Sequence, residues 1–251
     1  MELAARIRKN TRWNGPYGPL LHAVTPAAML RRTAGTVLRL FLWGHAALIG
    51  IVAVASLLLL FLNPPTTSLR LYRFFTRGWR AQPTTFVPLR QIPSVTRRMV
   101  VGVEDYTFYS HPGVDLAAIV QAYNVNKLIG YNLYGGSTIT QQLARTLFFN
   151  TRKTYLRKYV EAIAALELDL ILGKDRILEL YFNSIEWGKG VYGIGAAARY
   201  HFHKKVASLS LEETARLISI LTNPILYDVN TYWKSRQMAE RYRFLIGRYG
   251  S

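Results

Sequence analysis

Residues 135–145 have the sequence Gly-Gly-Ser-Thr-Ile-Thr-Gln-Gln-Leu-Ala-Arg, a stretch rich in hydroxyl and amide side chains. Its glycines indicate a loop, and Ser137 or Thr138 then provides the side chain of a helix N-cap. Ser137, Gln141 and Arg145 are spaced four residues apart, which predicts that they share one face of the helix. A hydroxyl, an amide and a guanidinium on one face suit the oxygens of a sugar and a phosphate. An ordinary polar surface is the alternative.

The sequence from about residue 94 onward is typical of helices. Apolar residues recur at helical spacing between residues 155 and 172 and stop at Gly173. Ser210 and Glu213 form a capping box that predicts a further helix, running to residue 221. Glycines at positions 188, 190, 193 and 195 predict a loop. No run alternates with a period of two residues, so the predicted fold is mainly α.

Residues 40–62 form an apolar run in which His45 is the only titratable side chain. As a helix the run is roughly 34 Å long, enough to cross the hydrocarbon core of a bilayer. A buried core helix is one alternative, but such helices are rarely apolar on every face. A cleavable signal peptide is another, but the run is long and Asn63-Pro64-Pro65 is a poor cleavage site. We therefore predict one transmembrane helix.

The apolar run divides the chain into four parts. Residues 1–39 are a basic N-terminal tail, residues 63–93 a juxtamembrane connector, and residues 94–251 the main domain. Arginines flank the run on both sides, so the charge bias does not set its orientation. The connector is basic and aromatic, which fits either a solvated linker or a surface held against anionic headgroups.

Composition indicates an anionic partner. The 251 residues include 32 Lys and Arg against 14 Asp and Glu, for a formal net charge of +18. Such an excess fits nucleic acid, a lipid surface or a phosphate-bearing substrate. The chain has no cysteine, which excludes disulfides and thiolate metal sites. The length suits one domain of moderate size together with an anchor.

Two carboxylates stand in cationic surroundings. No Asp or Glu occurs between Glu2 and Glu104. Glu104 is therefore either a salt-bridge partner or a carboxylate that takes part in a reaction. Glu161 follows a cationic segment that contains Arg152, Lys153, Arg157 and Lys158. Arg157 and Glu161, four residues apart, fit a simple surface pair. The alternative is that Glu161 shares a cationic cleft with Glu104, where carboxylates suit acid–base chemistry at a sugar.

Five sequence blocks occur in an order that resembles a known family. They are Glu104-Asp105-x-x-Phe108-x-x-His111-x-Gly113-x-Asp115, Gly136-Ser-Thr-Ile-Thr-Gln-Gln142, Arg157-Lys158-x-x-Glu161, Lys174-x-x-Ile177-Leu-Glu-x-Tyr181-x-Asn183 and Gly190-Val-Tyr-Gly193. With them, residues 85–230 resemble the glycosyltransferase domain of the peptidoglycan polymerases, in the monofunctional form called biosynthetic peptidoglycan transglycosylase. The sequence has no Ser-x-x-Lys or Lys-Thr-Gly, the motifs of a penicillin-binding transpeptidase.

The resemblance implies a lysozyme-like, mainly helical domain with a membrane-embedded lobe, beside the one N-terminal transmembrane helix. It implies polymerisation of lipid II into glycan strands, with inversion at C1 of MurNAc and release of undecaprenyl diphosphate. Glu104 matches the general base that deprotonates the 4-hydroxyl of the acceptor GlcNAc, and Glu161 matches the second family carboxylate. The positions implied in substrate binding are Phe108, Ser137, Gln141, Gln142, Arg145, Lys153, Arg157, Lys158 and Tyr192. By itself Phe108 fits a sugar platform or the core, and a lone His111 is expected to be structural.

The resemblance also implies partners and a location. The partners are lipid II, the nascent glycan, the membrane and other cell-wall synthesis proteins, while no nucleic-acid motif is present. A divalent cation, Mg²⁺ or Mn²⁺, assists some family members, but no residue here is assigned to it. The expected location is the bacterial inner membrane, crossed once, with the catalytic domain on the periplasmic side. Arg145 replaces the usual Lys and Lys153 the usual Arg, which keeps the charge and changes the hydrogen-bond geometry at the donor.

Two other functions compete with this interpretation. A lysozyme-like peptidoglycan hydrolase also works with two carboxylates, but the cationic segment and the anchor favour a donor that carries a diphosphate and a lipid. A non-catalytic basic protein that binds membranes is the other alternative, and it predicts that Glu104 is dispensable.

Overall fold

The computed structural model describes residues 26–130, 135–152 and 154–250. The predicted tail up to residue 25 and the predicted site residue Lys153 lie outside them. Contacts divide the chain into two units, one ending at Leu48 and the other beginning at Ile49. The second unit holds all helices after α2 and contains the candidate site.

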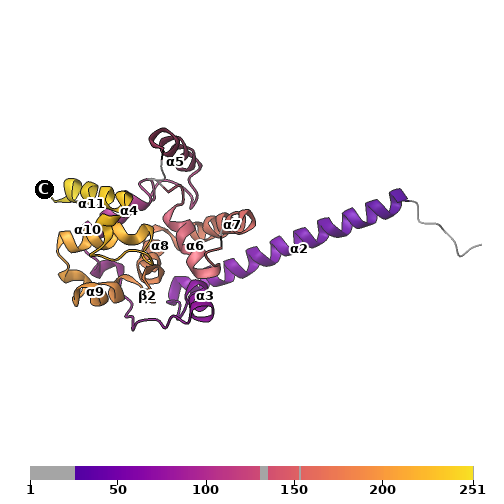
Figure 1. The fold of residues 1–251 in the computed structure, drawn as a ribbon. Helices are drawn as coiled ribbons and strands as arrows, with labels where there is room; N and C mark the ends of the chain where they lie inside the picture. Colours follow the sequence, from indigo (N-terminus) through magenta and orange to yellow (C-terminus); the bar gives the residue numbers. More distant parts are fainter. Residues whose placement is uncertain (1–25, 131–134, 153, 251) are drawn as a thin grey trace, which may run out of the picture. The chain divides into compact units, whose positions relative to one another are not determined.

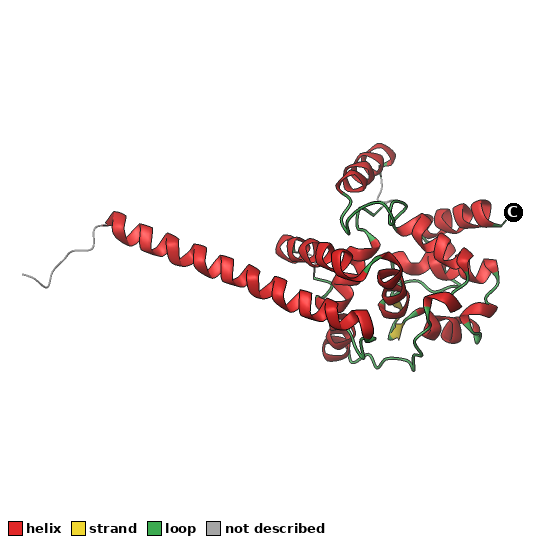
Figure 2. Ribbon diagram, turned by 180° about the vertical axis from the view of Figure 1, so that it is seen from behind, coloured by secondary structure: helices red, strands yellow, loops and turns green. Residues whose placement is uncertain are grey.

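The secondary structure is mainly helical, as the sequence predicts, and Figures 1 and 2 show one short strand pair among the helices. The elements in chain order are α2 (Pro26–Phe61), α3 (Ser68–Arg77), η1 (Leu89–Gln91), α4 (Ser94–Glu104), α5 (Leu116–Ile129), α6 (Ile139–Phe148), α7 (Tyr155–Leu172), α8 (Lys174–Ser184), β1 (Glu186–Gly188), β2 (Val191–Tyr192), α9 (Ile194–Phe202), η2 (Val206–Ser208), α10 (Leu211–Ser219), η3 (Ile220–Thr222), η4 (Tyr232–Lys234) and α11 (Arg236–Tyr249).

Helix α2 has the length and apolar composition needed to cross a membrane. It begins at Pro26, a residue favoured in the first turn of a helix, so the tail predicted over 1–39 is helical from residue 26. Its apolar part, Met29–Phe61, has 33 residues, about 50 Å of helix and more than a bilayer core requires. The uncharged part begins after Arg39, and a span that starts at residue 40 stays a prediction.

Helix α6 lies at the centre of the second unit and packs against α3, α7 and α8 (Figure 1). Ile139, Leu143 and Ala144 on α6 are fully buried. A fully buried Leu or Ile contributes about 1.5–3 kcal/mol, so this face holds α6 firmly. The helix begins with a capping box in which Thr138 accepts from the Gln141 N–H and the Gln141 side chain accepts from the Thr138 N–H. The capped start of α6 fixes the preceding residues 135–138, which line the cleft described below.

Three helix ends agree with the sequence prediction. Helix α7 covers residues 155–172 and stops at Gly173, whose φ of +73° favours glycine. Helix α10 starts with the predicted capping box of Ser210 and Glu213.

The predicted loop around the glycines at 188–195 is wrong in part, since β1 and β2 pair there as an antiparallel hairpin with Glu186 opposite Tyr192. Strands of two or three residues are too short to show an alternating pattern.

Helix α5 stands at the edge of the second unit in both ribbon views (Figures 1 and 2). Asp115 is its N-cap and accepts from the Ala118 N–H at 2.8 Å and from the Thr107 hydroxyl at 2.6 Å. These two donors, the Thr107 hydroxyl above all, lower the pKa of Asp115. The same carboxylate therefore ties α5 to the turn that follows α4.

We expect Asp115→Ala to destabilise α5 by about 1 kcal/mol, the usual loss for an N-cap. Because the folded pKa of Asp115 is lowered, its contribution is present above the ordinary carboxyl pKa and is lost as the pH falls through the folded value. Hydrogen exchange of the α5 amides at pH 7 measures the effect, since an edge helix opens locally. Asp115→Asn keeps the cap and is the control; equal exchange in the Asp115→Ala variant and the wild type would contradict the assignment.

Candidate active site

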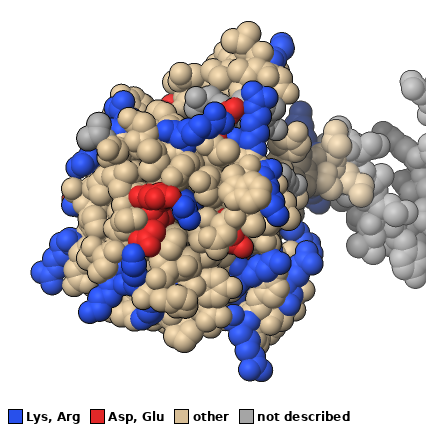
Figure 3. All heavy atoms as spheres, turned by 60° about the vertical axis from the view of Figure 1, so that its left-hand side comes forward, with Lys and Arg blue, Asp and Glu red and all other residues tan. Residues whose placement is uncertain are grey.

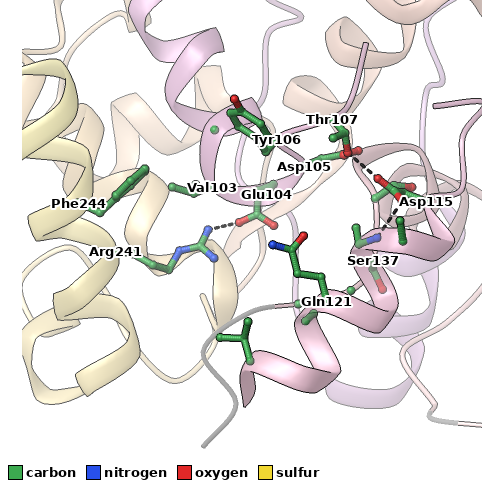
Figure 4. A pocket seen from close by; sticks show the side chains of 18 of the residues that line it. Val103, Glu104, Asp105, Tyr106, Thr107, Asp115, Gln121, Ser137, Arg241 and Phe244 are labelled. Carbon is green, nitrogen blue, oxygen red and sulfur yellow. Dashed lines mark hydrogen bonds and ion pairs between the residues drawn. The ribbon is translucent and has the colours of Figure 1, made fainter. Parts of the chain in front are cut away.

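A cleft of about 570 Å³ opens between α4, α5, the loop before α6, and α11. Figure 4 shows Glu104 at its centre, with Arg241 reaching toward Glu104 from α11 and Gln121 pointing into the same space from α5. The wall combines small apolar side chains of α5 with polar groups, and it includes Gly102, Val103, Glu104, Asp105, Tyr106, Thr107, Asp115, Ala117, Ala118, Gln121, Ala122, Val125, Gly135, Gly136, Ser137, Thr138, Glu240, Arg241 and Phe244. Glu104 and Ser137, predicted from separate blocks, thus face one cavity.

Glu104 is the last residue of α4, so its side chain projects from a helix end into the cleft. Arg241 donates to its Oε1, and Gln142 Nε2 donates to its Oε2 at 2.9 Å. The side chains of Glu104 and Arg241 are 11% and 13% exposed, so the pair is largely removed from water but open to the cleft. Two donors hold the carboxylate in one orientation, with lone pairs left for a hydroxyl.

Tyr181 fixes the orientation of Gln142. Its hydroxyl lies 3.1 Å from Gln142 Oε1, and its ring is fully buried on α8. Burial, followed by the nearby charge of Glu104, raises the pKa of Tyr181 well above its ordinary value. The phenol therefore keeps its proton and donates to Gln142 Oε1, which turns the amide nitrogen toward Glu104. A relay of hydrogen bonds runs from α8 through α6 to Glu104.

Asp105 and His111 form a buried pair behind the cleft. Asp105 Oδ1 lies 3.0 Å from His111 Nε2, and Asp105 Oδ2 accepts from the Ile139 N–H at 2.9 Å. Burial raises the pKa of Asp105 although the Ile139 N–H and His111 favour the charged form. Lys174 donates to the His111 carbonyl at 2.6 Å. The pair joins the residue after Glu104 to the start of α6, which agrees with the structural role expected for His111.

Gly113 fastens the same loop to α7. Its φ is +83°, and a Cβ there would lie 2.5 Å from the carbonyl oxygen of Ala165. Side chains larger than hydrogen are therefore excluded both by conformation and by space. The loop between α4 and α5 rests directly on the backbone of α7.

Glu161 is fully buried on α7 and engages two cations. Arg157 donates to one of its oxygens, and Lys158 Nζ lies 2.8 Å from the other. Lys158 Nζ is also 2.9 Å from Ser137 Oγ, and Ser137 lines the cleft. The predicted pairing of Arg157 with Glu161 is confirmed, but the pair is buried rather than on the surface. Glu161 is 0% exposed, and each of its two oxygens accepts from one of these cations.

Arg145 is the half-buried cation of α6. Its charge lowers the pKa of the buried Tyr181 hydroxyl, against the larger effect of burial. Among the residues that the structure describes, no carboxylate forms an ion pair with Arg145. A half-buried guanidinium without an internal counter-ion is suited to an anionic ligand.

The predicted face of Ser137, Gln141 and Arg145 is wrong. The helix begins at Ile139, so Ser137 precedes it, and Gln141 is 1% exposed because its side chain completes the capping box. Gln142, the next residue, is the one that reaches the site. In a capping box the side chain of the third helical residue binds the backbone of the N-cap residue and is not available to a ligand, which spacing alone does not reveal.

Two further predicted substrate positions are buried. Phe108 is 0% exposed, with Lys174 Nζ 4.9 Å from the ring centroid, so it belongs to the core rather than to a sugar platform. Tyr192 is 4% exposed and lies in β2, with its hydroxyl 3.3 Å from Glu186 Oε1. Neither side chain offers the surface that direct substrate contact requires.

Arg241 was not predicted. It belongs to α11 and meets Glu104 across 137 positions of the sequence. The segment around it, Arg236–Tyr249, resembles an ordinary basic amphipathic helix, and its spacing carries no signal of a partner on α4. Contacts of this range follow from the packing of α11 against α4 and α10.

The described carboxylates do not form a metal site. Within residues 26–130, 135–152 and 154–250, no group of three or more His, Asp or Glu is placed to hold a metal ion. Glu104 and Glu161 are each engaged by cationic side chains instead. The residues present therefore do not fit a divalent ion held by the protein.

Basic side chains are more widespread than acidic ones on the face drawn in Figure 3. Figure 3 shows one face on which Lys and Arg are spread widely, while Asp and Glu gather at a few spots. This distribution follows from the net charge of +18 and attracts anions over several ångströms.

Comparisons with known proteins identify the family of the chain. The family model described as Transglycosylase matches residues 72–249. A biosynthetic peptidoglycan transglycosylase of Burkholderia orbicola (strain MC0-3) is 39% identical over 199 residues, covering 76% of this chain and 79% of its own length. Its namesake from Paraburkholderia xenovorans (strain LB400) is 39% identical over 201 residues, covering 76% and 80%. That of Burkholderia vietnamiensis (strain G4 / LMG 22486) is 42% identical over 166 residues, covering 66% and 67%.

Proposed function

The chain belongs to the transglycosylase family, and from that membership we propose that it polymerises lipid II into peptidoglycan glycan strands. It is a peptidoglycan glycosyltransferase with the lysozyme-like, mainly helical domain of its family. The observation that carries the proposal is that Glu104 and Ser137 line the same cleft, and that Lys158 donates to the Ser137 hydroxyl. That arrangement supports a proton acceptor next to cations, as transfer from a sugar diphosphate requires.

The proposed reaction is a single displacement. The 4-hydroxyl of the acceptor GlcNAc gives its proton to Glu104, and its oxygen forms a bond to C1 of the donor MurNAc. The bond between C1 and the diphosphate oxygen breaks with inversion, and undecaprenyl diphosphate departs with the electron pair. The order of events matches general-base catalysis with a charged leaving group.

The cations on the α6 and α7 side are proposed to receive the diphosphate. Arg145 lacks an acidic partner within the described residues. Lys158 donates two hydrogen bonds, one to Ser137 Oγ and one to Glu161. Arg157 donates to the other oxygen of Glu161. Charge growing on the leaving group is stabilised by cations already in place. Lys153 remains a predicted member of the group, and assistance by Mg²⁺ or Mn²⁺ remains a prediction from the resemblance.

We further propose that the enzyme is a single-pass protein of the bacterial inner membrane with its catalytic domain on the periplasmic side. The apolar helix α2 supports an anchor, and the family's role in wall synthesis supports that side. Other wall-synthesis proteins are the expected partners.

The decisive test is a gel assay of the full-length protein with purified lipid II, with and without moenomycin, the phosphoglycolipid inhibitor typical of the family. Glycan polymer that moenomycin suppresses is the expected result. Shortening of finished peptidoglycan, without polymer from lipid II, would instead identify a hydrolase.

We expect Arg241→Ala to lower kcat by about 10–10²-fold, because Glu104 loses one of the two donors that orient it. Arg241→Lys keeps the charge without the fork and should recover part of the rate. Steady-state kinetics with lipid II measure kcat and KM separately, and thermal melting reports the fold. If Arg241 acts through Glu104, the double variant Arg241→Ala/Glu104→Gln is scarcely slower than Glu104→Gln alone; additive losses would contradict that route.

A further inference from the structure

Two exposed aromatic rings lie at the cleft. Tyr106 and Phe244 both line it, and they are 80% and 48% exposed. Single exposed aromatic side chains are common on soluble proteins and need no explanation. Two that line one cleft, beside the proposed catalytic carboxylate, leave a large apolar area open to a ligand. The proposed transfer of a proton to Glu104 uses neither ring.

The fold holds Tyr106 in this open position. Its neighbour Asp105 is buried and is bound to His111 and to the Ile139 N–H. Phe108 is 0% exposed, and its N–H donates to the Asp105 carbonyl at 3.0 Å, which closes a turn. Tyr106 lies in this turn between two buried side chains. Its exposure therefore follows from the way the turn is anchored.

Helix α11 fixes Phe244. Arg241 and Phe244 are three residues apart, and both belong to the face of α11 that lines the cleft. Arg241 is paired with Glu104 at the end of α4. Closer to its C-terminal end, α11 is tied to α4 again, because the Tyr249 hydroxyl donates to the Arg98 carbonyl at 3.1 Å. These two contacts hold Phe244 in place relative to α4 and to the turn that follows it.

The geometry of the proposed reaction assigns one side of the cleft to each sugar. Figure 4 shows Ser137 and Phe244 on opposite sides of Glu104. Ser137 accepts from Lys158, on the side proposed to receive the diphosphate. In a displacement with inversion, the attacking oxygen approaches C1 from the side opposite the leaving group. The sugar that attacks therefore lies on the side of Glu104 that carries Phe244.

The sugar that attacks suits aromatic rings chemically. A β-linked GlcNAc has only equatorial substituents, so each face of its ring presents C–H groups while the hydroxyls lie at the edge. An aromatic ring can cover such a face, and polar groups then bind the edge. The cleft offers both, because Glu104 and Gln121 point into the space that the two aromatic residues also line.

We propose that Tyr106 and Phe244 form a platform for the terminal GlcNAc of the acceptor and direct its 4-hydroxyl toward Glu104. The inference rests on the proposed polymerisation of lipid II. Stacking orients a sugar ring without engaging its hydroxyls, so the 4-hydroxyl stays free to give up its proton. A sugar is favoured over an acyl chain because the charged pair of Arg241 and Glu104 lies beside Phe244. The platform first predicted at Phe108 is thus assigned to two other rings.

Two modified substrates separate the acceptor from the donor. Lipid II with hydrogen in place of the 4-hydroxyl of GlcNAc acts only as donor. An analogue with a methylene group in place of the oxygen between C1 and the diphosphate acts only as acceptor. The full-length protein joins the two into a single tetrasaccharide product, so the KM of each substrate is measured while the other is saturating.

Tyr106→Ser and Phe244→Ala are each expected to raise the KM of the acceptor about 3–10-fold, the value of one aromatic contact, with kcat and the KM of the donor within about twofold of wild type. Tyr106→Phe and Phe244→Tyr keep a ring and should retain the wild-type KM. Tyr200→Ala is the matched control, since Tyr200 is 52% exposed and lies on α9, away from the elements that border the cleft. Thermal melting checks the fold of each variant.

An unchanged acceptor KM in both variants that lack a ring would overturn the platform. A rise in the donor KM alone would overturn it as well, because the rings would then hold the other sugar, and so would an equal effect of Tyr200→Ala. Calorimetric binding of the acceptor-only analogue tests the rings apart from turnover. A wild-type protein that binds this analogue more tightly than the two variants do, yet forms no tetrasaccharide, would support the platform and refute the proposed polymerisation.

Discussion

Replacement of Glu104 by glutamine will lower kcat for lipid II polymerisation by about 10²–10⁴-fold, the range that general-base catalysis contributes. Glutamine has the same shape but cannot take the proton of the acceptor hydroxyl. Gln142 and Arg241 remain beside the new side chain, so the cleft keeps its form. Binding of lipid II should change little, because the lost interaction develops in the transition state.

The measurement combines a polymerisation time course with a thermal melt. Arg241 loses its counter-charge in this variant, so a decrease of a few degrees in Tm is expected without loss of the fold. Glu212→Gln is the matched control, since Glu212 is 54% exposed and pairs with Arg216 away from the cleft. Near-normal turnover by the Glu104→Gln variant would exclude Glu104 from proton transfer.

Glu161→Gln is the second large effect, with an expected loss of about 10²-fold in kcat/KM. Glu161 is 0% exposed and pairs with Arg157 and Lys158, so the role proposed for it is to hold these two cations. An amide neutralises neither cation and turns its own NH₂ toward one of them. Displacement of such groups by about an ångström is enough for a loss of this size. The loss should appear mainly as weaker use of the diphosphate donor.

This variant must also lose stability. Removing one partner from a buried charge pair costs about 3–5 kcal/mol. Glu167→Gln on the same helix is the control, because both oxygens of Glu167 are buried with no hydrogen-bond partner among the described residues, and burial raises its pKa. Neutralising that side chain should leave Tm unchanged or raise it at pH 7. Lipid II kinetics together with melting curves decide the matter, and wild-type kcat/KM in the Glu161→Gln variant would exclude a role in catalysis.

Local patterns predicted the elements of this fold well. The ends of α7 follow from helical spacing and from Gly173, and the starts of α6 and α10 follow from Thr138 and Ser210. Each of these signals lies within a few residues of the feature that it predicts. The β1–β2 hairpin is too short to carry such a signal, and α3 was hidden in a connector because its apolar side faces outward.

The site was predicted only in part for a related reason. Sequence spacing brings Arg157 and Glu161 together because they share a helix, but it cannot reveal that Arg241 meets Glu104. Nor does it decide between neighbours: Gln141 caps α6 while Gln142 serves the cleft. Phe108 shows that an aromatic ring one turn from a carboxylate fits core and platform equally well until burial is known.

Helix α8 connects the end of the anchor helix to the site. Arg176 grips the end of the anchor, and Tyr181, about 7.5 Å further along the same helix, supports the relay to Glu104. If α2 is the membrane anchor, helix α8 therefore sets a fixed distance between the lipid surface and the place where the glycosidic bond forms. The diphosphate also holds the sugars of each precursor at a constant distance from the membrane. Each precursor therefore reacts at the same distance from the lipid surface, and the enzyme does not have to move toward or away from the membrane between additions.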